Sequence, residues 1–289
     1  MNPVGPLPKK VRIEYTRTHP EVQQQNANTR LGQILADVRE RLPDLRRREA
    51  ELRSAAAYLP APKPWSTAFD GPDVAVIAEV KRRSPSVGDI APDLDPAFLA
   101  GEYEAGGARA VSVLTNEPFF LGSLADVESV RTVISRPILR KDFIVDPVQL
   151  YETRAIGASA ALLIVRALEP QQLAELHQLA SELGLGTLIE VHDVKEIEDA
   201  LRVGPDCLGV NSRDLTTFRV DVNQVADVVR SVPAGIMTVA ESGLKNRADV
   251  EKVASWGADA VLIGTALARS REPAKAVERL TGVKKRGRS

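Results

Sequence analysis

The chain has little cysteine, little net charge and no long apolar run. Its single cysteine, Cys207, excludes an intramolecular disulfide framework and a cysteine metal cluster, which fits a reducing compartment. A formal net charge of −1 gives no bulk attraction to nucleic acid or to an anionic membrane, and we expect the basic runs Lys9–Lys10 and Lys284–Arg288 to be solvated. Residues 1–26 hold no signal-like apolar stretch, and no uncharged apolar run approaches the roughly 20 residues that span a bilayer. We therefore expect a cytoplasmic protein that binds neither nucleic acid nor membrane.

What the chain does have is enough apolar sequence for one large core. Its 289 residues are 44% hydrophobic, which suits a single domain, and a (β/α)8 barrel uses about 250 residues. Residues 1–30 are rich in Pro, Gln and Asn, and we expect them to form a partly disordered arm ahead of one domain spanning 31–289. From Arg30 to about Leu59 apolar residues recur at helical spacing, which predicts an extra helix before the barrel, with Pro43 as a candidate break.

Short β-branched and apolar runs then alternate with longer amphipathic segments, as in repeated βα units around a parallel sheet. The predicted strands are approximately Val74–Val80, Ala110–Leu114, Pro137–Arg140, Ala160–Val165, Thr187–Val191, Cys207–Val210, Met237–Ala240 and Ala260–Ile263. A Gly-Ala step at Gly107, Gly157 and Gly257 marks helix ends before buried strands. An open doubly wound sheet is the alternative, but eight units without a glycine-rich dinucleotide loop favour closure. We predict an α/β fold, a (β/α)8 TIM barrel with an N-terminal helical extension.

Charged side chains stand at the predicted carboxyl ends of these strands, where the active sites of such barrels are built. Glu79 and Lys81 lie two apart on one strand and share a face, so mutual neutralisation is the minimum interpretation and a purely structural ion pair is the alternative. The clustering of such residues at one end of the barrel favours an enzyme.

A lysine and a glutamate at two further strand ends extend this cluster. Lys141 follows the third predicted strand beside Asp142, and such a pair is often a solvated loop. A lysine near other cations or in an apolar mouth has a lowered pKa and can act as a general acid or form a Schiff base. Glu190 interrupts an apolar strand and needs a partner if it points inward, for which Lys141 is the obvious candidate.

Two loops at the seventh and eighth strand ends have the composition of a phosphate site. Glu241, Ser242 and Gly243 end the seventh strand, and Gly264 and Thr265 end the eighth just before a short segment. Barrel enzymes often bind phosphate between these loops through backbone N–H groups and the start of a short helix. Either glycine alone is explained equally by a turn, but the two together predict a phosphate site.

Other polar residues near strand ends are ambiguous. Ser84 and Ser86 form either an active-site loop or a turn. Asn211 offers an amide suited to a hydroxyl or a carboxylate, and Arg213 a guanidinium suited to a supporting carboxylate. His192 is better explained as a loop hydrogen-bonder than as a base. Because no His, Asp and Glu set has metal-ligand spacing, we predict a metal-free site.

Seven segments, in order along the chain, resemble the indole-3-glycerol phosphate synthase family. They are Glu79–Ser86, Ser112–Thr115, Leu139–Ile144, Ile189–His192, Gly209–Leu215, Ala240–Gly243 and Leu262–Thr265. The resemblance, which runs from about Leu31 to Leu280, implies a (β/α)8 barrel with an added N-terminal helix over the mouth. It implies conversion of 1-(2-carboxyphenylamino)-1-deoxyribulose 5-phosphate to indole-3-glycerol phosphate in tryptophan biosynthesis, with loss of carbon dioxide and water. It also implies a phosphorylated small-molecule substrate and no cofactor.

The resemblance further implies roles for single residues. Lys141 is the candidate acid that protonates the ribulose carbonyl oxygen, and Glu190 is the carboxylate at the ring-closure and dehydration centre. Glu79 and Lys81 complete the proton-transfer network, and the division of labour between Lys81 and Lys141 stays open. The remaining matched residues are Asn211, Arg213, Glu241 and Ser242 at the catalytic centre, Ser84, Ser86 and Phe143 on the substrate, and Gly243, Gly264 and Thr265 on the phosphate.

Three alternatives remain beside this interpretation. A sister barrel such as phosphoribosylanthranilate isomerase would favour a Cys/Asp acid-base pair, but Cys207 lies at the wrong end of its strand. A lysine aldolase would form an imine that borohydride traps. A catalytically dead scaffold would bind phosphate ligands without turnover. We expect a monomer or weak oligomer.

Overall fold

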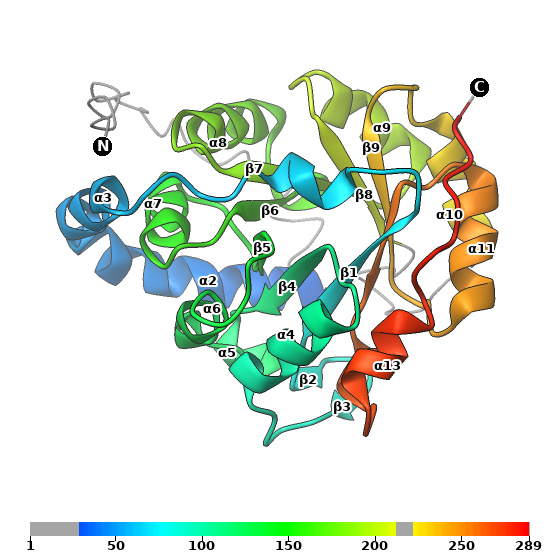
Figure 1. Cartoon of the computed structure of the whole chain (residues 1–289). Coiled ribbons are helices and arrows are strands. Elements are labelled where there is room, and N and C mark those ends of the chain that lie inside the picture. Colours follow the sequence, from blue (N-terminus) through cyan, green and yellow to red (C-terminus); the bar gives the residue numbers. More distant parts are fainter. Residues whose placement is uncertain (1–28, 212–221, 289) are drawn as a thin grey trace.

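The computed structural model describes residues 29–211 and 222–288, and its centre is a closed barrel of eight parallel strands surrounded by helices (Figure 1). Around the barrel the strands follow the order β1-β10-β9-β8-β7-β6-β5-β4, so each strand pairs with its sequence neighbours and the first closes on the last. The predicted (β/α)8 barrel is confirmed. The expected arm over residues 1–30 falls almost wholly outside the described residues, as does Arg213.

All eight predicted strands are present, with ends within two residues of the expected ones. They are β1 (Ala75–Val80), β4 (Ala110–Leu114), β5 (Ile138–Lys141), β6 (Ala160–Ile164), β7 (Gly186–Val191), β8 (Cys207–Asn211), β9 (Met237–Glu241) and β10 (Ala260–Ile263). Each of three predicted site residues, Lys141, Asn211 and Glu241, is the last residue of a strand and does not belong to the loop that follows. The rigid sheet therefore positions these three side chains.

Helices lie between successive strands of the barrel and after the last one. They are α4 (Pro96–Ala105), α5 (Glu117–Phe120), α6 (Leu124–Val130), α7 (Pro147–Ala155), α8 (Pro170–Glu182), α9 (Val194–Leu201), α10 (Val222–Ser231), α11 (Arg247–Trp256), α12 (Thr265–Ala268) and α13 (Pro273–Glu278), with 3-10 turns η1 (Trp65–Phe69) and η2 (Val165–Ala167). Several begin at an Asp, Asn or Ser whose side chain accepts a hydrogen bond from a first-turn N–H, as Asp146 does before α7 and Asp193 before α9. Each loop at the barrel mouth that ends in such a cap is thereby fixed at its far end.

The predicted extra helix is present as two helices, α2 (Arg30–Arg47) and α3 (Glu49–Tyr58). The break expected at Pro43 was wrong, because Pro43 lies inside α2 and the chain turns at Arg48. The buried side chains of α2 recur every three or four residues: Leu31, Ile34, Leu35, Val38 and Leu42. Burial of this stripe holds the helix through the proline, whose missing N–H removes one backbone hydrogen bond.

The C-terminal tail runs across the amino-terminal ends of the barrel strands, so the expectation of a solvated tail was wrong for part of it. The Lys285 ammonium donates to the carbonyl oxygen of Phe69 at 2.6 Å. The Arg288 side chain is buried, pairs with Asp259 at 3.3 Å and donates to the carbonyl oxygens of Gly257 and Ile236. The tail thus packs against the segments that lead into β1, β9 and β10.

None of the helices in the described ranges combines the length and the apolar character needed to cross a bilayer.

Candidate active site

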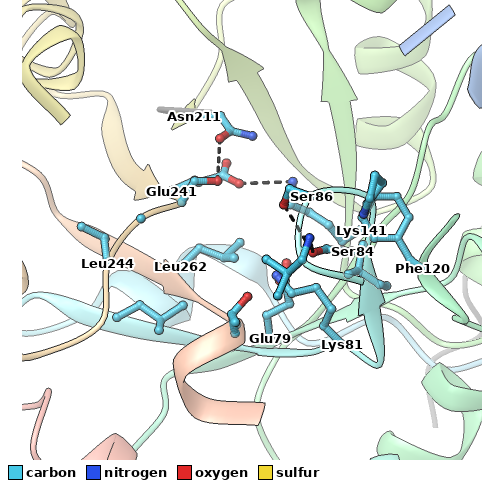
Figure 2. A pocket seen from close by; sticks show the side chains of 18 of the residues that line it. Glu79, Lys81, Ser84, Ser86, Phe120, Lys141, Asn211, Glu241, Leu244 and Leu262 are labelled. Atoms are coloured by element: carbon cyan, nitrogen blue, oxygen red, sulfur yellow. Dashed lines mark hydrogen bonds and ion pairs between the residues drawn. The ribbon is translucent and has the colours of Figure 1, made fainter. Parts of the chain in front are cut away.

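A cavity of about 730 Å³ opens at the carboxyl ends of the barrel strands (Figure 2). Its volume is in the range of small-molecule sites. Thirteen of the sequence-predicted site residues line it: Glu79, Lys81, Ser84, Ser86, Lys141, Phe143, Glu190, Asn211, Glu241, Ser242, Gly243, Gly264 and Thr265. The structure therefore brings together every predicted site residue that it describes.

Lys141 lies between two buried glutamates at the centre of this cavity. Its Nζ is 2.7 Å from Oε2 of Glu190 and 3.2 Å from Oε2 of Glu241. The three side chains come from β5, β7 and β9, alternate strands whose inward-facing positions meet in one layer of the barrel. The partner expected for Glu190 is the one observed.

Burial and mutual charge set the protonation of this triplet. Burial is the largest influence on Lys141 and opposes its charge, but the nearby carboxylates of Glu190 and Glu241 outweigh it and raise the pKa of the lysine. The general expectation of a lowered lysine pKa was therefore wrong here, because the neighbours are anions. An ammonium that stays protonated at neutral pH has a proton to donate, and it disfavours the neutral amine that a Schiff base requires.

The two glutamates respond in opposite directions. Burial disfavours the ionised form of Glu190, yet Lys141, His192 and a hydrogen bond from Asn211 together lower its pKa. For Glu241, burial and the charge of Glu190 prevail over Lys141 and raise the pKa to about 8. Two carboxylates that share one ammonium thus shift in opposite directions, the pKa of Glu190 downward and that of Glu241 upward.

We expect kcat/KM to fall as pH rises through about 8, because Glu241 then loses its proton and its anion competes with Glu190 for Lys141. Glu241→Gln cannot ionise, so its pH profile will lack this step whatever its absolute rate. The measurement is kcat/KM of both proteins from about pH 6 to about pH 9.5, a range that includes the expected titration of Glu241. A step near pH 8 that persists in the variant would assign the titration to another group.

Glu79 and Lys81 form the ion pair expected from their spacing, at the end of β1. Gly264, the residue directly after the neighbouring strand β10, leaves space for this ion pair. A Cβ atom at Gly264 would lie 2.2 Å from Oε1 of Glu79 and 2.8 Å from Nζ of Lys81. A side chain at Gly264 would displace the pair. This glycine therefore has a packing role in addition to the phosphate role expected for it.

Asn211 and Ser242 meet on the other side of the cavity. The Ser242 hydroxyl donates to Oδ1 of Asn211 at 2.7 Å, and the Asn211 amide also hydrogen-bonds Glu190. Ser242 has a φ of 65°, a left-handed conformation that is uncommon for a residue with a side chain, and Gly243 follows with a φ of 75°. These two left-handed residues turn the chain sharply at the end of β9, which exposes their backbone to the cavity.

The loop after β1 forms a small hairpin, β2 (Arg83–Ser84) with β3 (Gly88–Asp89), that the sequence analysis did not anticipate. Oγ of Ser84 accepts from the backbone N–H of Val87 at 3.2 Å and lies 3.4 Å from Oγ of Ser86. Ser84 is thus both a turn residue and a lining residue, so the two interpretations of it were not exclusive.

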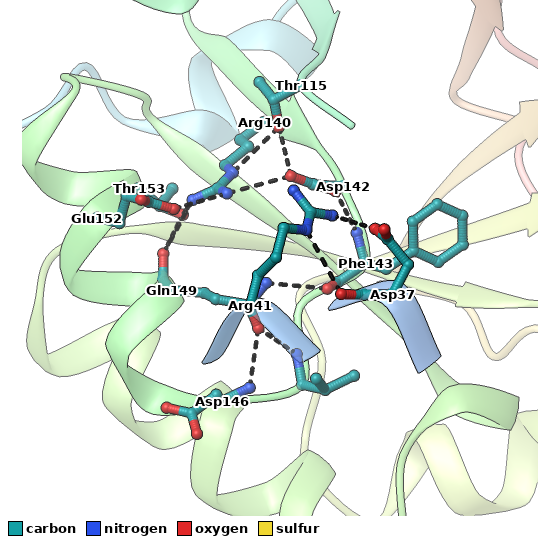
Figure 3. Close-up of polar contacts among 11 residues, drawn as sticks. Asp37, Arg41, Thr115, Arg140, Asp142, Phe143, Asp146, Gln149, Glu152 and Thr153 are labelled. Carbon is teal, nitrogen blue, oxygen red and sulfur yellow. Dashed lines mark hydrogen bonds and ion pairs between the residues drawn. The ribbon is translucent and has the colours of Figure 1, made fainter. Parts of the chain in front are cut away.

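A buried polar network on the outer side of β5 holds the backbone around Lys141 (Figure 3). Arg140 is 3% exposed and pairs with Asp142 at 3.1 Å and Glu152 at 2.8 Å. Asp142 in turn accepts a hydrogen bond from Thr115 at 2.6 Å. Arg140 and Asp142 flank Lys141 in sequence, so their contacts fix the strand end from which the lysine projects.

Sequence reasoning missed several other lining residues. They include Leu114, Phe120, Leu162, Ile164, Leu244, Lys245, Leu262 and Arg269. The apolar ones are ordinary inward strand or loop positions, indistinguishable from core without the barrel register. Phe120 faces Phe143 with ring centroids 6.2 Å apart. Lys245 and Arg269 follow Gly243 and Thr265 within a few residues, and that proximity was the available signal.

Within the described residues no group of three or more His, Cys, Asp or Glu side chains is placed to hold a metal ion.

The fold and the site define a (β/α)8-barrel enzyme with a buried lysine-carboxylate centre at its mouth. The model of the family described as indole-3-glycerol phosphate synthase matches residues 31–280. The chain belongs to the indole-3-glycerol phosphate synthase family.

Curated relatives agree with this assignment. Indole-3-glycerol phosphate synthases of Rhodococcus jostii and Mycobacterium avium are 48% and 46% identical over 254 residues, covering 86% of this chain and 93% and 92% of theirs. The one from Leifsonia xyli subsp. xyli is 48% identical, covering 84% of this chain and 95% of its own. The chain thus matches nearly the whole length of these relatives.

Solved structures at low identity show the same fold. A thiamine phosphate pyrophosphorylase from Pyrococcus furiosus superposes with a TM-score of 0.54 at 19% identity, covering 72% of this chain and 93% of that one. A 3-hexulose-6-phosphate synthase from Salmonella typhimurium gives 0.53 at 13% identity, covering 72% and 96%. These likenesses concern the barrel alone.

Proposed function

We propose that this chain is an indole-3-glycerol phosphate synthase that acts in tryptophan biosynthesis. It converts 1-(2-carboxyphenylamino)-1-deoxyribulose 5-phosphate to indole-3-glycerol phosphate, carbon dioxide and water. The observation that carries the proposal is the placement of Lys141 between Glu190 and Glu241 at the barrel mouth, in a family that catalyses this reaction by name.

Ring closure requires an acid at the carbonyl oxygen of the ribulose. The ring carbon that bears the carboxylate attacks the carbonyl carbon, and the carbonyl electron pair takes a proton from the Lys141 ammonium to form a hydroxyl. A carbon–carbon bond is made without a buildup of alkoxide charge. The raised pKa of Lys141 keeps the proton available until the oxygen arrives.

Decarboxylation and dehydration complete the indole. Loss of carbon dioxide returns the bonding electrons to the aromatic ring. Departure of the hydroxyl as water then needs one acid, and formation of the new double bond releases one proton to a base. Glu190, held ionised, is the base. Lys81 and Lys141 both line the cavity and share the two proton donations.

The rest of the cavity suits the two ends of the substrate. Gly243, Gly264 and Thr265 offer backbone N–H groups to the phosphate, including those of the first turn of α12 that have no partner within the helix. Lys245 and Arg269 add positive charge to the same wall. At the other end, Phe143 and Phe120 supply ring faces for the anthranilate group.

The supporting residues are assigned by contact. Asn211 hydrogen-bonds both Ser242 and Glu190, and Glu241 shares Lys141 with Glu190. Ser84 and Ser86 bring hydroxyls from the loop after β1 to the substrate. For Arg213, whose position lies outside the described residues, we propose the carboxylate-positioning role that the family resemblance implies.

The test is indole fluorescence on adding synthetic carboxyphenylaminodeoxyribulose phosphate to purified protein, with a chelator present. We expect product formation at a rate proportional to enzyme. Phosphoribosylanthranilate as substrate and borohydride trapping serve as parallel arms for an isomerase and an aldolase. Absence of indole product from well-folded protein, with turnover or trapping in another arm, would overturn the proposal.

A further inference from the structure

His192 lies directly after β7 and contacts the oxygen of Glu190 that Lys141 does not. Its Nε2 is 3.4 Å from Oε1 of Glu190, whereas Oε2 of that carboxylate is 2.7 Å from Nζ of Lys141. The histidine lies in the bend after β7, two residues beyond the glutamate, and the 3.4 Å distance shows that the two side chains face each other. The imidazole is almost fully buried, with 3% of its side chain exposed.

The opposite edge of the imidazole is held by a second carboxylate. Nδ1 of His192 is 3.4 Å from Oε2 of Glu196 on α9, and the same oxygen accepts the backbone N–H of His192 at 2.8 Å. Arg166, on η2 after β6, pairs with Oε1 of Glu196 at 2.6 Å and lies 3.6 Å from Asp193, the N-cap of α9. The Glu196 carboxylate is therefore held by two groups, Arg166 and the backbone N–H of His192, and it holds the imidazole in turn.

The resulting row runs from Arg166 through Glu196, His192 and Glu190 to Lys141, with the imidazole ring between two carboxylates. An imidazole nitrogen facing a carboxylate oxygen is favourable only when that nitrogen carries a proton. Nε2 is buried and makes no hydrogen bond within the described chain, and Oε1 of Glu190 at 3.4 Å is the carboxylate oxygen that faces it. Distances of this length in an unliganded site often shorten in the complex with substrate.

We propose that His192 is a positioning residue for the reaction: it donates from Nε2 to Oε1 of Glu190 and keeps the other oxygen of that base directed at the substrate. The inference rests on the proposed role of Glu190. Lys141 must turn toward the substrate carbonyl to protonate it, and during that step it cannot also hold Glu190. His192, together with the Asn211 amide, then keeps the carboxylate ionised and aligned. The direct effect of His192 on the pKa of Glu190, which is to lower it, agrees with this role.

Two amide substitutions at His192 test the contributions of Nδ1 and Nε2 separately. The Gln amide nitrogen can occupy the place of Nε2, whereas the Asn amide nitrogen occupies that of Nδ1. We expect His192→Asn to lower kcat by about 10- to 100-fold, the effect of losing one hydrogen bond to a charged group, with KM changed by less than about threefold. His192→Gln should recover most of that loss.

The matched control is His177→Asn. His177 lies on α8 and contacts Oγ1 of Thr187, near the other end of the same strand β7, at 3.0 Å. The His177→Asn substitution should leave kcat unchanged, because the contact between His177 and Thr187 lies at the end of β7 away from the barrel mouth. Wild-type kcat in His192→Asn, equal losses in the Asn and Gln variants, or a loss confined to KM would each overturn the inference. If the wild-type protein itself forms no indole, the proposed function fails; if it turns over and His192→Asn matches it, this inference alone fails.

A measurement on the native protein covers the case in which the variants do not fold. With ¹⁵N-labelled histidine the three histidines of the chain give few ring signals, which His177→Asn helps to assign. We expect a protonated Nε2 for His192 near neutral pH. An unprotonated Nε2 there would overturn the inference, since it could not donate to Glu190.

Discussion

Replacing Lys141 with methionine will lower kcat by on the order of 10²- to 10⁴-fold, the usual contribution of a positioned general acid. Methionine keeps much of the length and apolar stem of the side chain but has no proton to give to the carbonyl oxygen. It also leaves Glu190 and Glu241 without the ammonium that lies 2.7 and 3.2 Å from them. The pKa of both carboxyls will rise, so Glu190 will no longer be a fully ionised base.

The measurement is single-turnover formation of fluorescent indole product with saturating enzyme. Lys275→Met is the control, since Lys275 lies on α13 and pairs with Glu272 on the exposed surface. It should turn over at the wild-type rate. A Lys141→Met protein that is folded and retains more than about a tenth of the wild-type kcat would assign the acid role elsewhere, with Lys81 the first candidate.

Replacing Arg140 with methionine will lower the free energy of unfolding by about 3–5 kcal/mol, because it leaves Asp142 and Glu152 buried without their partner. Figure 3 shows both acids converging on the guanidinium from the loop after β5 and from α7. Loss of this contact will also loosen the backbone on each side of Lys141. We therefore expect kcat to fall in the protein that remains folded.

Urea unfolding followed by circular dichroism measures the first effect. Arg202→Met is the control: its partners Glu198 and Asp199 are on the exposed face of α9, where a pair contributes about 0–1 kcal/mol. Adding Glu152→Gln to Arg140→Met should return part of the stability, since it removes one uncompensated charge. Equal unfolding midpoints for Arg140→Met and Arg202→Met would show that the network is not a structural determinant.

The sequence was sufficient for the barrel and for most of the site because both depend on local pattern. Strand runs ending in a charged residue identified Lys141, Glu190 and Glu241, since an inward polar side chain interrupts an apolar strand and is visible as such. The parallel order of strands then brings those ends together without further information.

What sequence could not supply depends on neighbours distant in the chain. The pKa of Lys141 rises because carboxylates from β7 and β9 face it, and their proximity follows only from barrel closure. Arg140 gave no signal because its partners lie on the outer face, across a loop and a helix. The packed tail was missed because Arg288 donates to backbone carbonyl oxygens, which no side-chain pattern marks.

Two glycines lie beside carboxylates that line the cavity, and they limit how those positions can change. A Cβ atom at Gly209 would lie 2.2 Å from Oε1 of Glu241, as one at Gly264 would from Oε1 of Glu79. A larger residue at either glycine would push the carboxylate of the glutamate on the adjacent strand out of its present position. Evolution or design that enlarges either glycine therefore also moves a carboxylate of the cavity, so each glycine and its glutamate change as a pair.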